Sequence, residues 1–110
     1  MKIVYWSGSG NTERMAELIK EGIISSGQTV ETSLVSEVNV DDLLKDEIIV
    51  LGCPAMGDEV LEESEFEPFI EEIASKVSGN KVALFGSYGW GDGQWMRDFE
   101  ERMISYGCTI

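Results

Sequence analysis

The first twelve residues constrain this chain most, because a short apolar strand runs directly into a loop of small polar residues. Lys2 to Trp6 is β-branched and aromatic almost throughout, which is typical of a buried strand. The loop Ser7-Gly8-Ser9-Gly10-Asn11-Thr12 combines glycines, which allow close backbone approach to a ligand, with hydroxyl and amide donors. A helical pattern follows at once, so unpaired N–H groups and a positive dipole end would face the loop. The sequence therefore predicts an anion-binding site that suits a phosphate.

The residues after the last glycine of this loop restrict the kind of phosphate. A triphosphate-binding P-loop would place a Lys and a Ser or Thr there, whereas Asn11, Thr12 and Glu13 follow Gly10. A dinucleotide fingerprint needs a third glycine at position 13, which is Glu. The loop therefore fits a lone phosphate held by neutral donors. Taken alone, it also fits an ordinary strand-to-helix turn capped by Ser and Asn, so the phosphate interpretation depends on the other loops.

Composition restricts the classes of partner. At 110 residues with 43% hydrophobic content, residues 1–110 make one small domain with a single core. The formal net charge of −13 argues against nucleic acid and against an anionic membrane surface, because both need Lys and Arg. A basic protein partner, attracted by long-range charge, is the expectation instead.

Cysteine and histidine usage restricts the chemistry. Cys53 and Cys108 are far apart, in no CxxC spacing, and each lies at a predicted strand end, so we expect buried thiols in a reducing cytoplasm. The sequence contains no His, which excludes Ser–His and Cys–His catalysis and the common zinc sites. No signal peptide precedes the first strand and no apolar run approaches the length of a membrane span, so the predicted location is cytoplasmic.

Strand and helix patterns alternate along the chain. The patterns predict helices at 11–26, 64–77 and 94–105, a helical turn at 41–44, strands at 2–6, 29–34, 47–52 and 81–85, and the start of a strand at 108–110. This alternation predicts an α/β fold with a doubly wound parallel sheet. Ligands of such sheets bind beyond the carboxyl ends of the strands. The loops 7–12, 54–59 and 87–93 all follow predicted strands, so we expect them to form one site.

These three loops resemble the FMN-binding loops of flavodoxins, and most closely those of the short-chain flavodoxins of anaerobic bacteria such as clostridia. The second and third loops read Gly52-Cys53-Pro54-Ala55-Met56-Gly57-Asp58-Glu59 and Phe85-Gly86-Ser87-Tyr88-Gly89-Trp90-Gly91-Asp92-Gly93. The resemblance covers essentially the whole chain. It implies strand order 2-1-3-4-5, non-covalent FMN, and an electron-transfer protein rather than an enzyme. It also implies low-potential one-electron exchange between redox proteins, with the flavin shuttling between semiquinone and hydroquinone.

The resemblance also implies roles for particular residues. Residues 7–12 would hold the phosphate, Met56 and Trp90 would lie against the two flavin faces, and Glu59 would accept a hydrogen bond from flavin N3–H. Ser9 stands where the family usually has Thr, which keeps the hydroxyl. The residues assigned to the cofactor are Ser7, Gly8, Ser9, Gly10, Asn11, Thr12, Pro54, Ala55, Met56, Gly57, Asp58, Glu59, Ser87, Tyr88, Gly89, Trp90 and Gly91. From the residues alone, Met56 fits core filling and Trp90 an exposed loop aromatic, and Trp6 and Trp95 are expected to pack beside the site.

An acidic stretch follows the second loop. Between residues 58 and 72 the chain has eight Asp and Glu residues and no Lys or Arg. A solvated helix face explains such a run. It would also repel an anionic reduced flavin and attract basic partners.

Family members continue past residue 110, so the resemblance implies a C-terminally incomplete domain whose fifth strand and last helix are largely missing. An open sheet edge can pair with another chain, which makes self-association or strand exchange an expectation. One alternative function is an FMN-binding module or fragment that carries no electrons by itself. A phosphoacceptor receiver domain needs acids where Trp6-Ser7 and Cys53-Pro54 stand, and nothing supplies the nicotinamide site of a quinone reductase.

Overall fold

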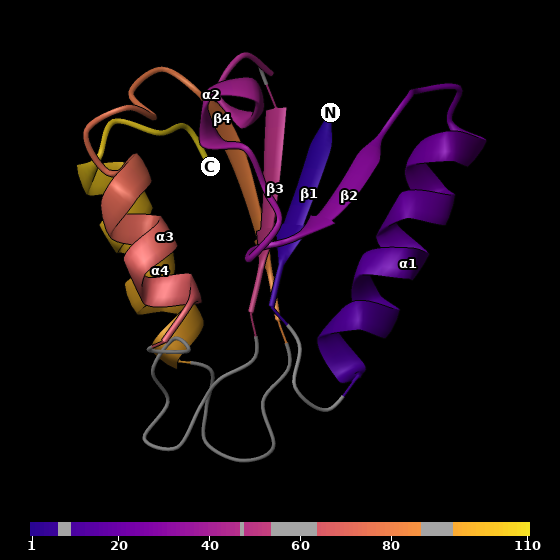
Figure 1. Cartoon of the computed structure of the whole chain (residues 1–110), viewed down its shortest axis with the longest axis horizontal. Helices are drawn as coiled ribbons and strands as arrows, with labels where there is room; N and C mark the ends of the chain where they lie inside the picture. The colour runs from indigo at the N-terminus through magenta and orange to yellow at the C-terminus, as the bar shows by residue number, and fades with distance from the viewer. Residues whose placement is uncertain (7–9, 47, 54–63, 87–93) are drawn as a thin grey trace.

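The computed structural model describes residues 1–6, 10–46, 48–53, 64–86 and 94–110. Short β-branched and apolar runs form a parallel sheet in the order β2-β1-β3-β4, seen through the middle of Figure 1. The strands are β1 (Lys2–Tyr5), β2 (Glu31–Leu34), β3 (Ile48–Gly52) and β4 (Lys81–Phe85). The helices are α1 (Asn11–Ser25), α2 (Val40–Leu43), α3 (Phe66–Ile73) and α4 (Gln94–Ser105). The predicted α/β fold, parallel sheet and order of the first four strands are confirmed.

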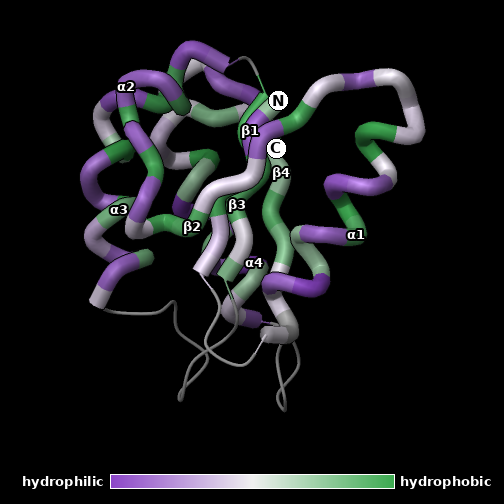
Figure 2. Tube along the Cα trace, turned by 45° about the vertical axis from the view of Figure 1, so that its right-hand side comes forward, coloured by the Kyte–Doolittle hydropathy of each residue, from purple (hydrophilic) through white to green (hydrophobic). Residues whose placement is uncertain are grey.

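Helices cover both faces of the sheet, because successive side chains of each strand point to opposite sides. Figure 1 shows α1 on one side of the sheet and α3 and α4 on the other. Ile3 and Val50 pack with Ala16 of α1, whereas Val4 and Leu51 belong to the larger core on the opposite face. Figure 2 shows the purple and green segments that alternate along α1, as expected of a helix with one apolar face. The sheet is therefore doubly wound.

Helix α3 is shorter than the sequence pattern predicts. It runs only from Phe66 to Ile73, whereas the apolar periodicity predicts a helix over 64–77. Beyond Ile73, the N–H of Lys76 donates to the carbonyl of Ile73, a three-residue spacing that tightens the backbone into a turn. Val77 is still fully buried, so the periodicity correctly marks a core residue but not the helix end. Pro68 lies in the first turn of α3, where a missing N–H is tolerated.

Strand β2 also begins later than predicted, at Glu31 rather than at residue 29. Its pairing with β1 starts where β1 starts, with Glu31 opposite Lys2. Thr29 and Val30, which precede β2, therefore have no residue of β1 beside them. Both cysteines are buried and form no disulfide, as predicted, and burial raises the pKa of the Cys108 thiol.

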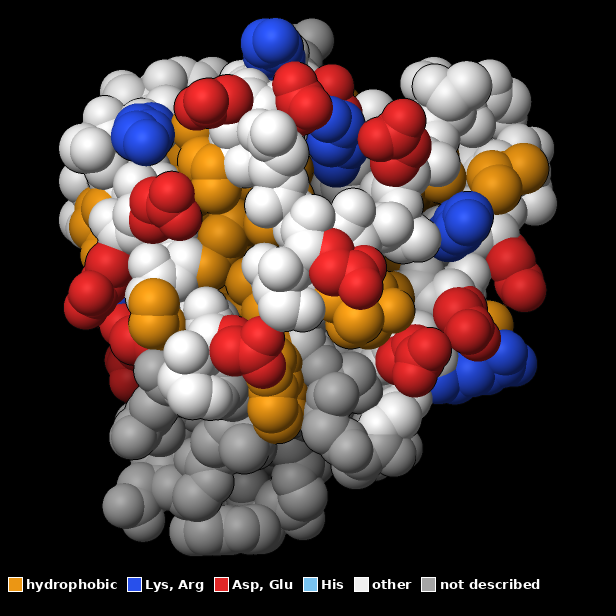
Figure 3. All heavy atoms as spheres, viewed as in Figure 1, with side chains coloured by type: hydrophobic (Ala, Val, Ile, Leu, Met, Phe, Trp, Pro, Cys, Tyr) orange, Lys and Arg blue, Asp and Glu red, His pale blue; other side chains and the backbone are white. Residues whose placement is uncertain are grey.

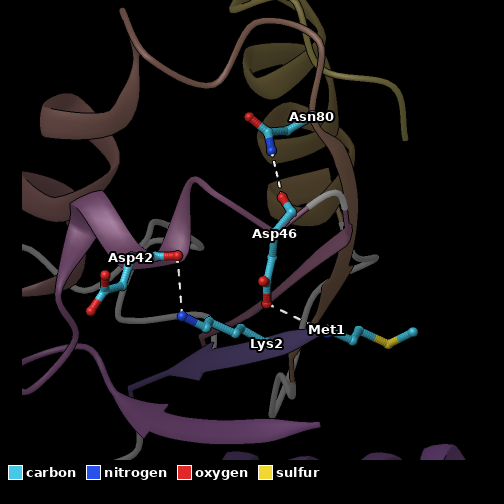
Figure 4. Close-up of polar contacts among 5 residues, drawn as sticks. All are labelled: Met1, Lys2, Asp42, Asp46 and Asn80. Atoms are coloured by element: carbon cyan, nitrogen blue, oxygen red, sulfur yellow. Dashed lines mark hydrogen bonds and ion pairs between the residues drawn. The ribbon is translucent and has the colours of Figure 1, made fainter. Parts of the chain in front are cut away.

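Polar contacts tie together the amino ends of the strands, as Figure 4 shows. The amino group of Met1 pairs with the carboxylate of Asp46 at 3.4 Å, and Lys2 Nζ donates to the carbonyl of Asp42 at 3.1 Å. Asn80, just before β4, donates its side-chain amide to the carbonyl of Asp46 at 2.9 Å. These contacts link β1, α2 and β4 at one end of the sheet. The carboxyl ends of the strands lie at the other end.

Residues 108–110 lie along the outer edge of β4. Thr109 forms a single parallel bridge with Lys81, and the N–H of Val82 donates to the carbonyl of Thr109 at 2.8 Å. The predicted start of a further strand is therefore confirmed as one bridge. On β4 itself, Ala83 is exposed to solvent.

Candidate functional site

The carboxyl ends of the neighbouring strands β1, β3 and β4 lie side by side at the same level of the sheet. The register places Tyr5 of β1 opposite Gly52 of β3, and Gly52 opposite Phe85 of β4. The ladder continues one step further, with the N–H of Trp6 donating to the carbonyl of Gly52 at 3.0 Å and that of Cys53 donating to Phe85 at 3.2 Å. The three loops expected to form one site therefore depart from adjacent strands at the same level. This is the arrangement that the strand pattern predicts.

Most of the predicted site residues lie outside the described residues. These are Ser7, Gly8, Ser9, Pro54, Ala55, Met56, Gly57, Asp58, Glu59, Ser87, Tyr88, Gly89, Trp90 and Gly91. The described remainder, Gly10, Asn11 and Thr12, lies at the start of α1. Figure 1 shows that α1, α3 and α4 all begin at the end of the sheet where β1, β3 and β4 finish. Three helix N-termini, which carry partial positive charge, therefore lie at this end.

The start of α1 has the features of a phosphate site. Gly10 is the N-cap with a φ of 92°, a left-handed conformation that glycine adopts without strain, and it has no side-chain oxygen to cap the first turn. Thr12 is 1% exposed, and its hydroxyl is buried with no hydrogen-bond partner in the part of the chain that the structure describes. An unpartnered buried hydroxyl is costly unless an acceptor completes it. A phosphate oxygen at the helix N-terminus would supply that acceptor, so the described residues are compatible with the phosphate of FMN.

Gly86 brings β3, β4 and α4 into close contact at the same end. A Cβ atom on Gly86 would lie 2.0 Å from the carbonyl oxygen of Cys53 and 2.4 Å from the ring of Trp95. Only glycine therefore fits there without displacing backbone. Trp95 is 3% exposed, which matches the prediction that it packs beside the site. Its indole N–H, like the Thr12 hydroxyl, is buried without a partner among the described residues.

The structure adds one contact that the sequence did not reveal. Trp6, just beyond β1, donates its indole Nε1–H to the carboxylate of Glu65 at 3.2 Å, immediately before α3. The two residues are 59 positions apart, and neither belongs to a recognisable motif. The available signal was positional, because the sequence predicts that Trp6 ends a strand and that Glu65 lies in the first turn of a helix, both at the same end of the sheet.

The acidic stretch is not wholly solvated. Glu67 of α3 forms an ion pair with Arg102 of α4, and both side chains are about 30% exposed. Burial would lower the pKa of the Arg102 guanidinium, but hydrogen bonds with Tyr106 and Glu67 raise it overall.

Partial burial and the nearby carboxylates of Glu13, Glu17 and Glu37 raise the pKa of Tyr5, at the end of β1. Three carboxylates therefore lie near the carboxyl end of β1, and Figure 3 shows acidic side chains spread over one face of the molecule.

The described part of the chain shows neither a membrane-spanning helix nor a metal-binding cluster. None of its helices combines the length and the apolar character needed to cross a bilayer. No group of three or more Cys, Asp or Glu side chains in that part comes together as a metal-binding cluster.

Comparisons with known proteins agree with this geometry. The family model described as flavodoxin matches residues 3–110. A flavodoxin from Clostridium beijerinckii is 74% identical over all 110 residues, which span 80% of that protein. A flavodoxin from Megasphaera elsdenii is 49% identical over the same 110 residues, again 80% of its length.

The fold comparison is equally close. The solution structure of two-electron reduced Megasphaera elsdenii flavodoxin superimposes with a TM-score of 0.94 at 50% identity, covering 98% of this chain and 79% of that one. The family model, the strand order and the glycine-capped start of α1 together lead to one assignment. The chain belongs to the flavodoxin family of FMN-containing electron-transfer proteins, which are not enzymes.

Proposed function

We propose that this chain is a low-potential, one-electron carrier that exchanges electrons between redox proteins through FMN. The observation that carries the proposal is the row formed by the ends of β1, β3 and β4, with the buried Thr12 hydroxyl beside it. When bound, FMN supplies reversible one-electron redox chemistry. The protein supplies binding, orientation and charge around it.

The site residues have distinct proposed tasks. Residues 7–12 hold the phosphate through backbone N–H groups and hydroxyls, and Thr12 donates its hydroxyl hydrogen to a phosphate oxygen. Met56 and Trp90 lie against the two faces of the flavin ring, because a polarizable thioether and a large indole both pack well on an aromatic surface. Glu59 accepts a hydrogen bond from the N3–H edge. The departure of the three loops from adjacent strand ends supports this division of tasks.

The negative charge of the protein lowers the one-electron potential of a bound flavin and favours basic partner proteins. The net charge of −13 disfavours adding an electron to a bound flavin, and each ~1.4 kcal/mol of such destabilisation lowers a one-electron potential by about 59 mV. The same field attracts basic redox proteins to the flavin edge. We place the chain in the cytoplasm, because its two cysteines are buried and form no disulfide. Self-association through the edge of β4 stays a prediction, which sedimentation at several protein concentrations would test.

The first experiment is an FMN titration of the flavin-free 110-residue chain, followed by stepwise reduction. We expect quenching of flavin fluorescence at one equivalent, and then a long-wavelength absorbance band at the one-electron stage. Failure of a folded chain to quench FMN would contradict the proposal. Tight binding without the one-electron band would favour the alternative of an FMN-binding module that is not a carrier.

A further inference from the structure

Trp6 contacts both ends of the segment that contains the second cofactor loop. Its backbone N–H donates to the carbonyl of Gly52 at 3.0 Å, on the side where the chain enters that segment. Its indole Nε1–H donates to Glu65 Oε1 at 3.2 Å, on the side where the chain leaves it. Trp6 is also the residue directly before the phosphate loop. One residue next to the phosphate loop therefore contacts the two residues that flank the segment with the second loop.

The backbones of both partners are held by the scaffold, and the hydrogen bond between their side chains lies exposed at the surface. Trp6 extends β1, and its ring packs against the larger hydrophobic core. Glu65 is the N-cap residue of α3, and its carbonyl accepts the N–H of Phe69 at 3.2 Å. A contact between two such anchored residues restricts the spacing of the loops that they flank, and restricted loops lose less conformational freedom when a ligand binds.

We propose that Trp6 and Glu65 form a positioning pair that holds the phosphate loop and the second flavin loop at the separation that FMN requires. The inference rests on the proposed function. The pair acts through the loops rather than by touching the cofactor. Its loss should therefore weaken FMN more than it weakens the fold.

The test is a double-mutant cycle in the 110-residue chain, with Trp6→Phe, Glu65→Ala and the combined variant. Trp6→Phe keeps an aromatic ring but removes the N–H donor, and Glu65→Ala removes the acceptor. Each single change should raise the FMN dissociation constant about fivefold, as measured by fluorescence quenching. Because the two changes break the same bond, the combined variant should be no weaker than the weaker single variant.

Two further variants separate the hydrogen bond from charge. Glu65→Gln loses the charge but keeps an acceptor oxygen, so its FMN affinity should stay within about twofold of the wild type. Glu101→Ala, an exposed change on α4, removes the same charge away from the pair and should leave the affinity unchanged. Urea unfolding of each flavin-free variant reports the fold, and the midpoint for Glu65→Ala should shift little.

The outcomes are decisive. Additive losses in the cycle, equal weakening by Glu65→Gln, or equal weakening by Glu101→Ala would each overturn the positioning role while leaving the proposed function intact. An unfolding midpoint that falls in parallel with affinity would reduce the pair to a stabilising contact and overturn it as well. A wild-type chain that fails to bind FMN would overturn both proposals.

Discussion

At the scale of single residues, Thr12 offers the sharpest test of the phosphate site, because its buried hydroxyl has no partner in the described part of the chain. Thr12→Val keeps the shape and removes the polar group. The flavin-free protein should therefore gain about 1 kcal/mol in free energy of unfolding, since an unsatisfied buried group costs about 1–3 kcal/mol. FMN binding should weaken at least about tenfold, because a hydrogen bond to a charged group is lost. Urea unfolding and fluorescence titration measure the two effects.

Thr12→Ser is the matched control, because it keeps the hydroxyl and removes only a methyl group. Its FMN affinity should stay much closer to that of the wild type than the affinity of Thr12→Val. If Thr12→Val destabilised the flavin-free chain and left FMN affinity unchanged, the hydroxyl would have a structural role and the phosphate assignment would be wrong.

The sequence indicates which residue types line the site, but it does not show how they are buried or paired. Thr12 is recognisable as a donor from its place after Gly10. Its burial to 1% exposure is a property of the tertiary structure, which no local pattern specifies. The Trp6–Glu65 bond joins residues 59 positions apart, and such pairings follow from tertiary structure.

At the scale of elements, two glycines should respond to alanine in opposite directions. A Cβ at Gly86 would overlap the carbonyl of Cys53, so Gly86→Ala has to separate the ends of β3 and β4 or move Trp95. Overpacking of this kind costs about 1–3 kcal/mol. Gly22, inside α1, has nothing within 4 Å of its Cβ position, so Gly22→Ala should stabilise the chain by about 0.5–1 kcal/mol. Urea unfolding of both variants gives the two values.

The same pair of variants distinguishes effects on the site from effects on the fold. Gly86 is in contact with both strand ends and α4, so its alanine variant should also weaken FMN binding, whereas Gly22→Ala should not. A Gly86→Ala protein as stable as the wild type would show that this end of the sheet relaxes more easily than the close approach implies.

Element type was predictable from the sequence, while element ends were less so. The pattern predicts β4 over 81–85 and α4 over 94–105, and the structure has the same bounds. Helix α3 ends four residues before its apolar periodicity ends, because a turn at 74–76 still buries Val77. Burial and backbone conformation are different properties, and the hydrophobic pattern reports the first.

At the scale of the whole molecule, the sheet order and the alignment of the carboxyl ends of β1, β3 and β4 follow from general rules for parallel α/β folds. Because the chain leaves each parallel strand at its carboxyl end, α1, α3 and α4 all begin at that end of the sheet, although they are distant in sequence. What the rules do not specify is the distance between the loops. That depends on residues such as Gly86, which has no side chain, and Trp6, because they affect how closely the strand ends and helix starts approach one another.

The net charge of −13 belongs to the whole molecule and predicts how electron transfer depends on salt. Long-range attraction raises the encounter rate with a basic partner by about 10- to 1,000-fold at low ionic strength. The screening length falls from about 30 Å at 0.01 M to about 3 Å at 1 M, so the attraction is lost as salt is added. With a lysine-rich haem protein as electron acceptor, the stopped-flow second-order rate of the reduced chain should fall at least about tenfold over this range. With an uncharged quinone as acceptor, the rate should change little, and a haem-protein rate equally insensitive to salt would contradict charge-guided docking.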